Sequence, residues 1–332
     1  MSQFSHTKTL FHLPSNVVYL DGNSLGPMPL AAREHVATMM GNEWGEQMIK
    51  GWNNAGWMSL STQIGDRIAP LIGAEPGHVI MGDTLSIKVH QALAAALALN
   101  PGRKVILSDY GNFPSDLYIA QGLIKTLDRG HTLKTVAPED VSHHIDDQVA
   151  VLMLTEVDYR TSRKHDMQAL TATAHAHGVI TLWDLAHSVG ALPVDLVGSN
   201  VDFAVGCTYK YLNGGPGAPA FIYVCPAYVN KVDSSLSGWL GHAAPFDFEL
   251  DYRAAQGIER LRVGTPPVIA LKCLEPALDI WDLVTIDQVR KQSIALCELF
   301  IREVESRCPG LTLNSPRNPQ ERGSQVSFCF EE

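Results

Sequence analysis

Two residues that could carry out chemistry together follow neighbouring predicted strands. Asp184 ends the apolar run Val179–Trp183, and Lys210 comes soon after the next run, Phe203–Val205. Lysine is usually a solvated surface charge, but a buried lysine amine can form an imine with an aldehyde. Tyrosines on both sides of Lys210 and the Gly-rich run 213–217 favour the buried amine. Asp184 taken alone is more typical of a helix N-cap.

Upstream segments supply groups that suit a phosphate and an aromatic ring. Residues 82–86, Gly-Asp-Thr-Leu-Ser, lead into the predicted helix Ile87–Leu99, where N–H groups and hydroxyls could bind an anion. Plain N-capping by Thr84 or Ser86 is the commoner role of such a motif in isolation. Residues 109–116 follow the predicted strand Val105–Leu107 and add an aromatic ring and a carboxylate. The combination of cradle, ring, Asp184 and Lys210 predicts a site for pyridoxal 5'-phosphate (PLP).

These residues need a scaffold that brings strand ends together. Further apolar runs, Val149–Leu154 and Phe221–Val224, alternate with helical segments such as Asp166–His177. This order predicts an α/β fold in which a mostly parallel sheet is covered by helices. Ligands of such sheets bind beyond the carboxyl ends of the strands, where the candidate residues lie.

The pattern changes after Thr265-Pro266-Pro267. Two helices are expected, about Val268–Leu283 and Ile286–Arg307, the second with a capping box formed by Thr285 and Gln288. A strand-like run, Gln325–Phe330, follows. The expected domains are an N-terminal arm of the small domain (1–45), a large cofactor-binding domain (46–267) and an incomplete α+β small domain (268–332).

Composition narrows the classes of function. The 332 residues carry a net charge of −10, which argues against a nucleic-acid partner. The longest purely apolar run, Ala92–Leu99, is too short to cross a membrane, and no secretory signal is visible. Six scattered cysteines without a C-x-x-C pair favour a reducing, cytoplasmic setting. The histidines at 143, 144, 175 and 177 lack ligand spacing, so no metal site is expected.

The sequence resembles the bacterial kynureninase family, PLP enzymes of the aspartate-aminotransferase fold, type I. The similarity covers essentially the whole chain. It is carried by Val18–Pro27, Phe113–Asp116, Trp183–His187, Thr208–Asn213, Ser237–Trp239 and Gly264–Pro267.

The resemblance implies a role for each matching residue. Lys210 would bind the PLP aldehyde, Asp184 would pair with the pyridinium nitrogen, and Tyr209 would be a proton donor. Asp116, also counted as catalytic, would lie near the ring. The backbone of Leu85, with Ser86 and Tyr209, would hold the phosphate. The remaining cofactor contacts would come from Phe113, Pro114, Ser115, Thr155 and His187, with Trp239 and Thr265 contributing across a dimer interface.

The implied reaction is hydrolysis of L-kynurenine, or 3-hydroxykynurenine, to L-alanine and anthranilate or 3-hydroxyanthranilate. It belongs to tryptophan catabolism by the kynurenine pathway, which leads to NAD biosynthesis. A cytoplasmic homodimer with a small amino-acid substrate, and without nucleic-acid or membrane partners, is expected.

The sequence departs from the family pattern near its last residue. The family's carboxylate-binding arginine lies in an Arg-Phe-Gly-like context beyond a Gly-Ser-Gln-Val-Ser-Phe strand, and neither Arg317 nor Arg322 matches it. The chain is therefore expected to bind PLP better than it hydrolyses kynurenine. Two alternatives stay open: another type I PLP enzyme, such as a cysteine desulfurase, a selenocysteine lyase or an aminotransferase, and an inactive chain that binds PLP or a partner only.

Overall fold

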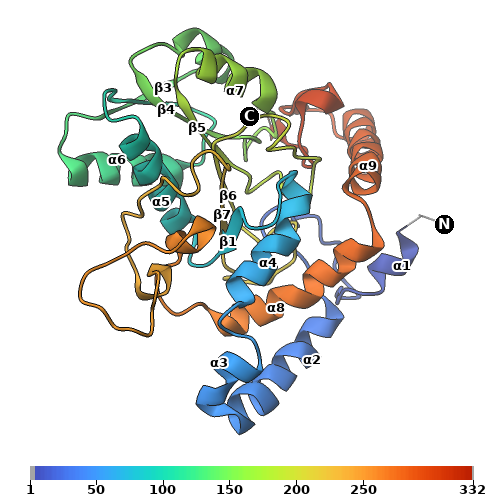
Figure 1. Cartoon of the computed structure of the whole chain (residues 1–332). Coiled ribbons are helices and arrows are strands. Elements are labelled where there is room, and N and C mark those ends of the chain that lie inside the picture. Colours follow the sequence, from blue (N-terminus) through green and yellow to red (C-terminus); the bar gives the residue numbers. More distant parts are fainter. Residues whose placement is uncertain (1–3, 331–332) are drawn as a thin grey trace.

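A seven-stranded sheet forms the centre of the computed structural model (Figure 1), with strand order β1-β7-β6-β5-β4-β2-β3. The structure describes residues 4–330, so the first three residues of the predicted arm and the last two of the predicted small domain lie outside it. The strands of this sheet are β1 (Val79–Met81), β2 (Val105–Asp109), β3 (Thr132–Val136), β4 (Val149–Thr155), β5 (Ile180–Asp184), β6 (Phe203–Gly206) and β7 (Phe221–Val224).

The sheet is mixed but mostly parallel, as predicted. Strands β3, β2, β4, β5 and β6 run parallel to one another, and β7 is antiparallel to both β6 and β1. All five strands predicted for this sheet are present. Sequence patterns missed β1, which has three residues, and the edge strand β3, in which only Val136 is buried. The carboxyl ends of β2, β4, β5 and β6 therefore meet at one edge of the sheet.

Helices cover both faces of the sheet. Helices α4 (Leu60–Ile68), α7 (Met167–Ala176) and α8 (Val268–Asp279) share one apolar core with it, and α5 (Leu85–Leu99) and α6 (Pro114–Leu127) share the other. Figure 1 shows α5 and α6 on the side of the sheet opposite α4 and α8. Successive residues of a strand point to opposite faces, so Val79 of β1 enters the first core and Ile80 the second.

The remaining helices are mostly short. They are α1 (Ser5–Lys8), α2 (Leu30–Thr38), the π-helical η1 (Met39–Glu46), α3 (Gly51–Asn54), α9 (Ile286–Arg307) and the 3₁₀ segments η2 (Met48–Lys50), η3 (Ala69–Ile72), η4 (Pro138–His144), η5 (Trp239–Gly241), η6 (Gly257–Leu261), η7 (Ile280–Leu283) and η8 (Pro319–Glu321). Within residues 4–330, no helix is both long and apolar enough to cross a membrane.

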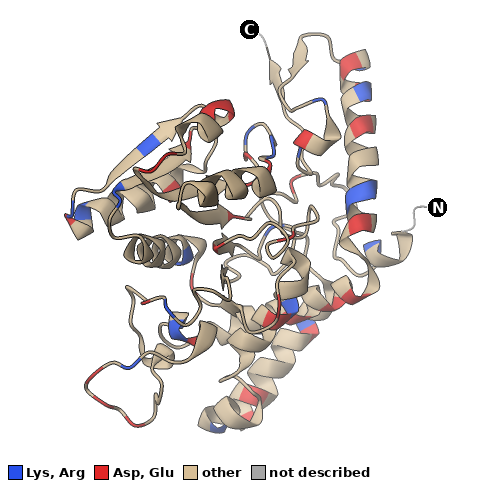
Figure 2. Cartoon of the chain, turned by 45° about the horizontal axis from the view of Figure 1, so that its top comes forward, with Lys and Arg blue, Asp and Glu red and all other residues tan. Residues whose placement is uncertain are grey.

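The C-terminal part follows the predicted pattern with one correction. Helix α9 begins with the predicted capping box, and charged side chains are spread along its exposed length (Figure 2). A separate two-stranded sheet pairs β8 (Leu311–Leu313) with β9 (Phe328–Phe330). The prediction of a strand from Gln325 was wrong for 325–327, because the paired residues begin at Phe328 and the Gln325 side chain instead contacts Tyr159 and His187. The division into arm, large domain and small domain stays a prediction.

Candidate active site

A cavity of about 250 Å³ opens beyond the carboxyl ends of β4, β5 and β6. It brings together nine of the residues predicted from the sequence: Leu85, Ser86, Phe113, Ser115, Thr155, Asp184, His187, Tyr209 and Lys210. Thr84, Tyr159 and Ala186 complete its lining. These side chains come from parts of the chain that are far apart in sequence, so the sheet is what assembles the site.

Lys210 lies in the loop that follows β6, and its amine points into the cavity. The Lys210 Nζ atom lies 2.8 Å from Nε2 of His187. It also lies 5.9 Å from the centre of the Phe113 ring and 5.7 Å from that of Tyr209. The N-terminal segment holds this loop, because Gly26 donates its N–H to the Tyr209 carbonyl at 2.9 Å. The amine is thus placed among aromatic rings rather than in open solvent.

Asp184 and Asp116 form a buried pair of carboxyl groups. Asp184 ends β5, and its Oδ1 accepts the Ala186 N–H at 2.9 Å, so it caps a turn and no helix begins there. Burial raises the pKa of Asp184 to about 6, although the positive charge of Lys210 opposes the shift. Burial and then the neighbouring Asp184 charge raise the pKa of Asp116 well above its ordinary value. Asp116 therefore holds a proton more tightly than Asp184, and Asp184 is the carboxyl group of the pair that ionises more readily.

The start of α5 provides the predicted anion cradle. A tight turn at Gly82 and Asp83, both with positive φ, leads from β1 to the extended N-cap residue Thr84. The Thr84 side chain makes no capping hydrogen bond to any described residue. Because a helix leaves its first N–H groups without intrahelical partners, those at the start of α5 are available to an anion. Leu85 and Ser86, the first two residues of α5, line the cavity, so this end of the helix faces it.

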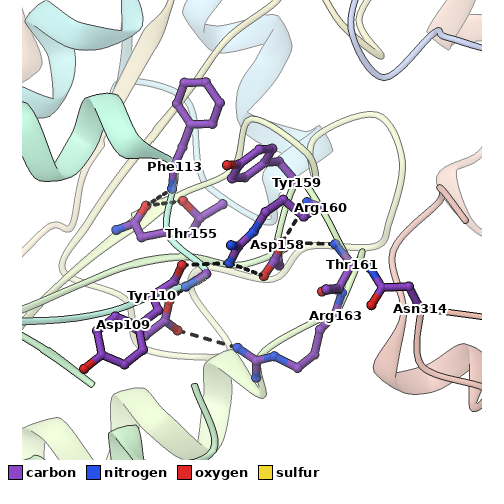
Figure 3. A network of polar contacts seen from close by, with 12 residues as sticks. Asp109, Tyr110, Phe113, Thr155, Asp158, Tyr159, Arg160, Thr161, Arg163 and Asn314 are labelled. Atoms are coloured by element: carbon purple, nitrogen blue, oxygen red, sulfur yellow. Dashed lines mark hydrogen bonds and ion pairs between the residues drawn. The ribbon is translucent and has the colours of Figure 1, made fainter. Parts of the chain in front are cut away.

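An aromatic wall is held by a small polar network (Figure 3). Asn112 accepts the Phe113 N–H at 2.7 Å and the Thr155 hydroxyl at 2.6 Å, which ties the start of α6 to the end of β4. The Tyr159 ring packs edge-on against Phe113, with 5.1 Å between ring centres. Tyr159 was not predicted as a site residue; its position shortly after a strand's carboxyl end was the available signal.

The loop that carries Tyr159 is itself fixed. Asp158 accepts the backbone N–H groups of Arg160 and Thr161 at 2.7 and 3.1 Å. Asp109 of β2, which is buried, lies 3.5 Å from the Arg163 guanidinium (Figure 3). It also lies 2.5 Å from the His165 ring. These contacts turn an irregular segment into a rigid wall of the cavity.

Tyr209, Cys207 and His187, which lie around Lys210, are all uncharged at neutral pH. Burial, with the nearby Cys207 sulfur as the next cause, raises the pKa of the Tyr209 hydroxyl to about 12. Burial raises the pKa of the Cys207 thiol to about 12 as well. Burial and then the charge of Lys210 lower the pKa of His187 to about 4, so its ring is neutral.

Four predicted site residues do not line this cavity. Pro114 is the first residue of α6, and Asp116 lies behind Asp184. Trp239 borders a separate hollow with Pro245 and Phe248, and Thr265 lies in a narrow gap beside Gly82 and Lys88. Within a single chain, the structure therefore does not bring Trp239 and Thr265 into the main cavity.

No arginine among the described residues lines the cavity. Arg317 forms an ion pair with Glu305, and the buried Arg322 reaches Glu298 and the carbonyl of Pro316. Both arginines therefore make their contacts away from the cavity.

The residues present fit PLP by their donor and acceptor chemistry. A free amine, an ionised buried carboxylate and unpaired helix N–H groups face one cavity, matching an aldehyde, a pyridine nitrogen and a phosphate.

Comparisons with known proteins agree with this fit. Residues 53–332 match the family Aminotransferase class-V. A kynureninase from Pseudomonas fluorescens is 48% identical over 325 residues, which are 96% of this chain and 78% of that relative. A kynureninase from Burkholderia pseudomallei (strain K96243) has the same identity and coverage.

Solved structures show the same fold at lower identity. A C-DES mutant with glycine covalently linked to its PLP cofactor superposes with a TM-score of 0.84 at 19% identity, over 96% of this chain and 84% of that one. An apo cysteine desulfurase from Thermococcus onnurineus NA1 has a TM-score of 0.81 at 18% identity, over 98% and 81% of the two chains.

Proposed function

Since the chain belongs to the kynureninases, within the class-V aminotransferase family, we propose that it hydrolyses L-kynurenine to anthranilate and L-alanine with PLP as cofactor. 3-Hydroxykynurenine is a second candidate substrate. The observation that carries the proposal is that the Lys210 amine and the Asp184 carboxylate open into the same cavity as the N-terminus of α5.

Three contacts would hold the cofactor. The N–H groups at the start of α5, with the hydroxyls of Thr84 and Ser86, would bind its phosphate. Asp184 would keep a proton on the pyridine nitrogen, because an ionised carboxylate in a buried site favours the neighbouring positive charge. Phe113 would stack on the ring, and Tyr159 supports Phe113 from its edge.

The reaction needs a proton acceptor and a proton donor at the substrate. PLP, when bound, supplies an electron sink for the charge that develops at the substrate α-carbon. Lys210 would attach to the cofactor aldehyde and, once displaced by substrate, remove the α-proton with its Nζ atom. Tyr209, whose pKa of about 12 keeps its hydroxyl protonated, would donate a proton on the same side.

A desulfurase function is not favoured by the cavity. Such chemistry uses a reactive thiolate, which needs exposure and a lowered pKa. None of the six cysteines, all within the described residues, lines the cavity. Cys207, which lies near Lys210 in the sequence, is buried and its pKa is raised to about 12.

We propose that the chain acts as a cytoplasmic homodimer. Trp239 and Thr265 lie outside the main cavity of their own chain, and Trp239 is partly exposed beside Phe246 and Phe248. A second copy could use these residues to complete its site. The arm at 1–45 is proposed to belong to the small domain at 268–332, with residues 46–267 as the large cofactor-binding domain.

The test of the proposed function combines turnover with labelling. Purified protein is loaded with PLP, and anthranilate release from L-kynurenine is followed by its fluorescence. Borohydride reduction and peptide mapping should place the cofactor on Lys210, and Lys210→Ala should abolish both label and turnover. Labelling of the buried Lys88 instead, or sulfide release from cysteine without anthranilate, would contradict the proposal.

A further inference from the structure

The side chain of Gln325 joins the C-terminal segment to the cavity through His187. We propose that Gln325 is a positioning residue that fixes the tautomer of His187, so that His187 Nε2 accepts a hydrogen bond from the Lys210 amine. The inference rests on the proposed function in one respect, namely that Lys210 is the reactive amine. From sequence, Gln325 was only the first residue of a predicted strand and had no role in the site.

Three consecutive contacts define this arrangement. Gln325 Nε2 lies 2.6 Å from the backbone oxygen of Tyr159, and Gln325 Oε1 lies 3.1 Å from Nδ1 of His187. His187 Nε2 in turn lies 2.8 Å from Nζ of Lys210. The contacts form a continuous chain from the wall of the cavity to the amine.

The chemistry of donors and acceptors assigns every proton in this chain. A backbone carbonyl only accepts hydrogen bonds, so the amide group that faces Tyr159 must be the NH₂ of Gln325. The amide oxygen of Gln325 therefore faces His187, and because it only accepts, Nδ1 of His187 must carry the hydrogen. A neutral imidazole has one N–H, so Nε2 presents a lone pair to Lys210.

Burial supports the neutral ring that this assignment requires. The His187 side chain is buried at the end of the cavity, and burial, followed by the charge of Lys210, keeps its pKa near 4. The reversed Gln325 amide would place two oxygens 2.6 Å apart, which is repulsive. The orientation is thus set by geometry.

The segment that carries Gln325 is anchored on both sides. Ser324 donates its hydroxyl to the Ala191 carbonyl at 3.0 Å, and Gly323 donates its N–H to the Ser162 carbonyl at 2.7 Å. From α9, Arg290 binds the carbonyl of Gly323 at 2.9 Å. Because the backbone on the N-terminal side of Gln325 is fixed in this way, its side chain can hold His187 with little loss of conformational freedom at the moment of reaction.

The consequence for the reaction is an oriented lysine. One N–H of the Lys210 amine is held by His187, which limits the directions in which the amine can face once it is free of the cofactor. Gln325 lies in the segment after η8, so the position of this segment affects the reactive amine through His187. Loss of this link should reduce turnover more than substrate binding.

The direct test reads the tautomer in the cofactor-free chain. Ring-¹⁵N histidine labelling and long-range ¹H–¹⁵N spectra distinguish Nδ1–H from Nε2–H, and the His187 signals are assigned by their loss in His187→Phe. Wild type should show Nδ1–H at His187. Gln325→Met, which keeps the size but removes both hydrogen bonds, should give a mixture of tautomers. An Nε2–H tautomer in wild type, or no change in Gln325→Met, overturns the proposal.

Kinetics then test whether Gln325 acts through His187. We expect Gln325→Met to lower kcat on the order of 10-fold with little change in KM, since a small misplacement of a reacting group has effects of this size or more. In the His187→Phe background, the same substitution should have no further effect, because the two residues act as one unit. Additive losses would overturn this part of the inference.

A matched control comes from the same segment. Gln320 is exposed in η8, outside the cavity lining, and Gln320→Met should change neither the His187 tautomer nor kcat. Failure of the proposed function can be told apart from failure of this inference. A wild type that releases no anthranilate contradicts the function, whereas the His187 tautomer is measured without cofactor or substrate. Circular dichroism and thermal unfolding check that each variant is folded.

Discussion

At the scale of single residues, protonation decides what the carboxyl pair can do. Asp184 and Asp116 are both buried, and two charges so close together in a site with little water are unfavourable. Asp116 therefore keeps its proton and donates a hydrogen bond to Asp184. That hydrogen bond, the Ala186 N–H and the charge of Lys210 all favour an ionised Asp184. The pair carries one negative charge, suited to one pyridinium nitrogen.

This arrangement predicts a pH-dependent affinity for PLP. The folded chain holds the pKa of Asp184 at about 6, so lowering the pH from 7 to 5 protonates it and removes the partner of the ring nitrogen. We expect the affinity to fall by about 10-fold across this range through Asp184 alone. Asp184→Asn should lack this component and lose turnover on the order of 100-fold or more, because a buried electrostatic contact to the reacting system is gone.

The measurement is a PLP titration of cofactor-free protein, followed by absorbance at several pH values. At each pH, the PLP affinity of the wild type is divided by that of Asp184→Asn. The ratio cancels the pH effects that come from the phosphate and from Lys210, which both proteins share. Asp116→Asn is the matched control: burial and the Asp184 charge raise the pKa of Asp116, so Asp116 is the partner that retains the proton, and the pH dependence of Asp116→Asn should resemble that of wild type. A ratio that is independent of pH would show that Asp184 does not titrate in this range.

At the scale of elements, the N-terminal segment and the loop after β6 hold each other in place. Gly26 approaches the Lys210 loop so closely that a Cβ atom would fall on the Lys210 carbonyl oxygen and the Asn213 side chain. Its N–H donates to Tyr209, the residue next to the reactive amine. The Val18–Pro27 segment thus supports the site through this contact with the Lys210 loop.

Gly26→Ala should therefore disturb both stability and the cofactor. A backbone clash of this kind has to be relieved by moving the loop, and we expect the free energy of unfolding to fall by about 1–3 kcal/mol. The absorbance of bound PLP should weaken in parallel. Gly22→Ala is the control, because no described atom lies within 4 Å of a Cβ built there. Urea unfolding of both variants is the measurement, and equal stabilities would contradict the packing argument.

At the scale of the whole molecule, exposed apolar side chains cluster in one long loop. Trp239, Phe246, Phe248 and Leu250 are all exposed, Leu250 completely. The Phe246 ring packs edge-on against both Trp239 and Phe248. A cluster of this kind on the surface is typical of an interface.

We expect the PLP-loaded protein to be a dimer by light scattering. Leu250→Glu would place an unpaired charge in the interface and should weaken dimerisation on the order of 10-fold or more. The exposed Val197, which lies in a different loop, supplies the control Val197→Glu. Cofactor binding should weaken with Leu250→Glu alone if Trp239 and Thr265 complete the neighbouring site. A stable PLP-loaded wild-type monomer would contradict the prediction.

Local patterns in the sequence determined the scaffold and the principal reactive groups. Apolar runs bounded by turns identified five strands of the main sheet, and cap residues identified α7 and α9, because these signals depend on neighbouring residues only. Asp184 and Lys210 could be found because each follows a buried strand, and parallel strands end at a common edge. The short β1 and the exposed β3 carry too few apolar residues to give such a signal.

Only the tertiary structure decided which other groups meet the reactive amine and which protons they carry. Gln325 contacts His187 across 138 residues of sequence, and no local pattern encodes a contact between two irregular segments. Tyr159 enters the wall for the same reason. The protonated Asp116 and the neutral His187 depend on burial and on charges brought close by folding, which are properties of the packed site rather than of the residue types. The sequence therefore identified the reactive groups, while packing fixed their partners, orientation and charge.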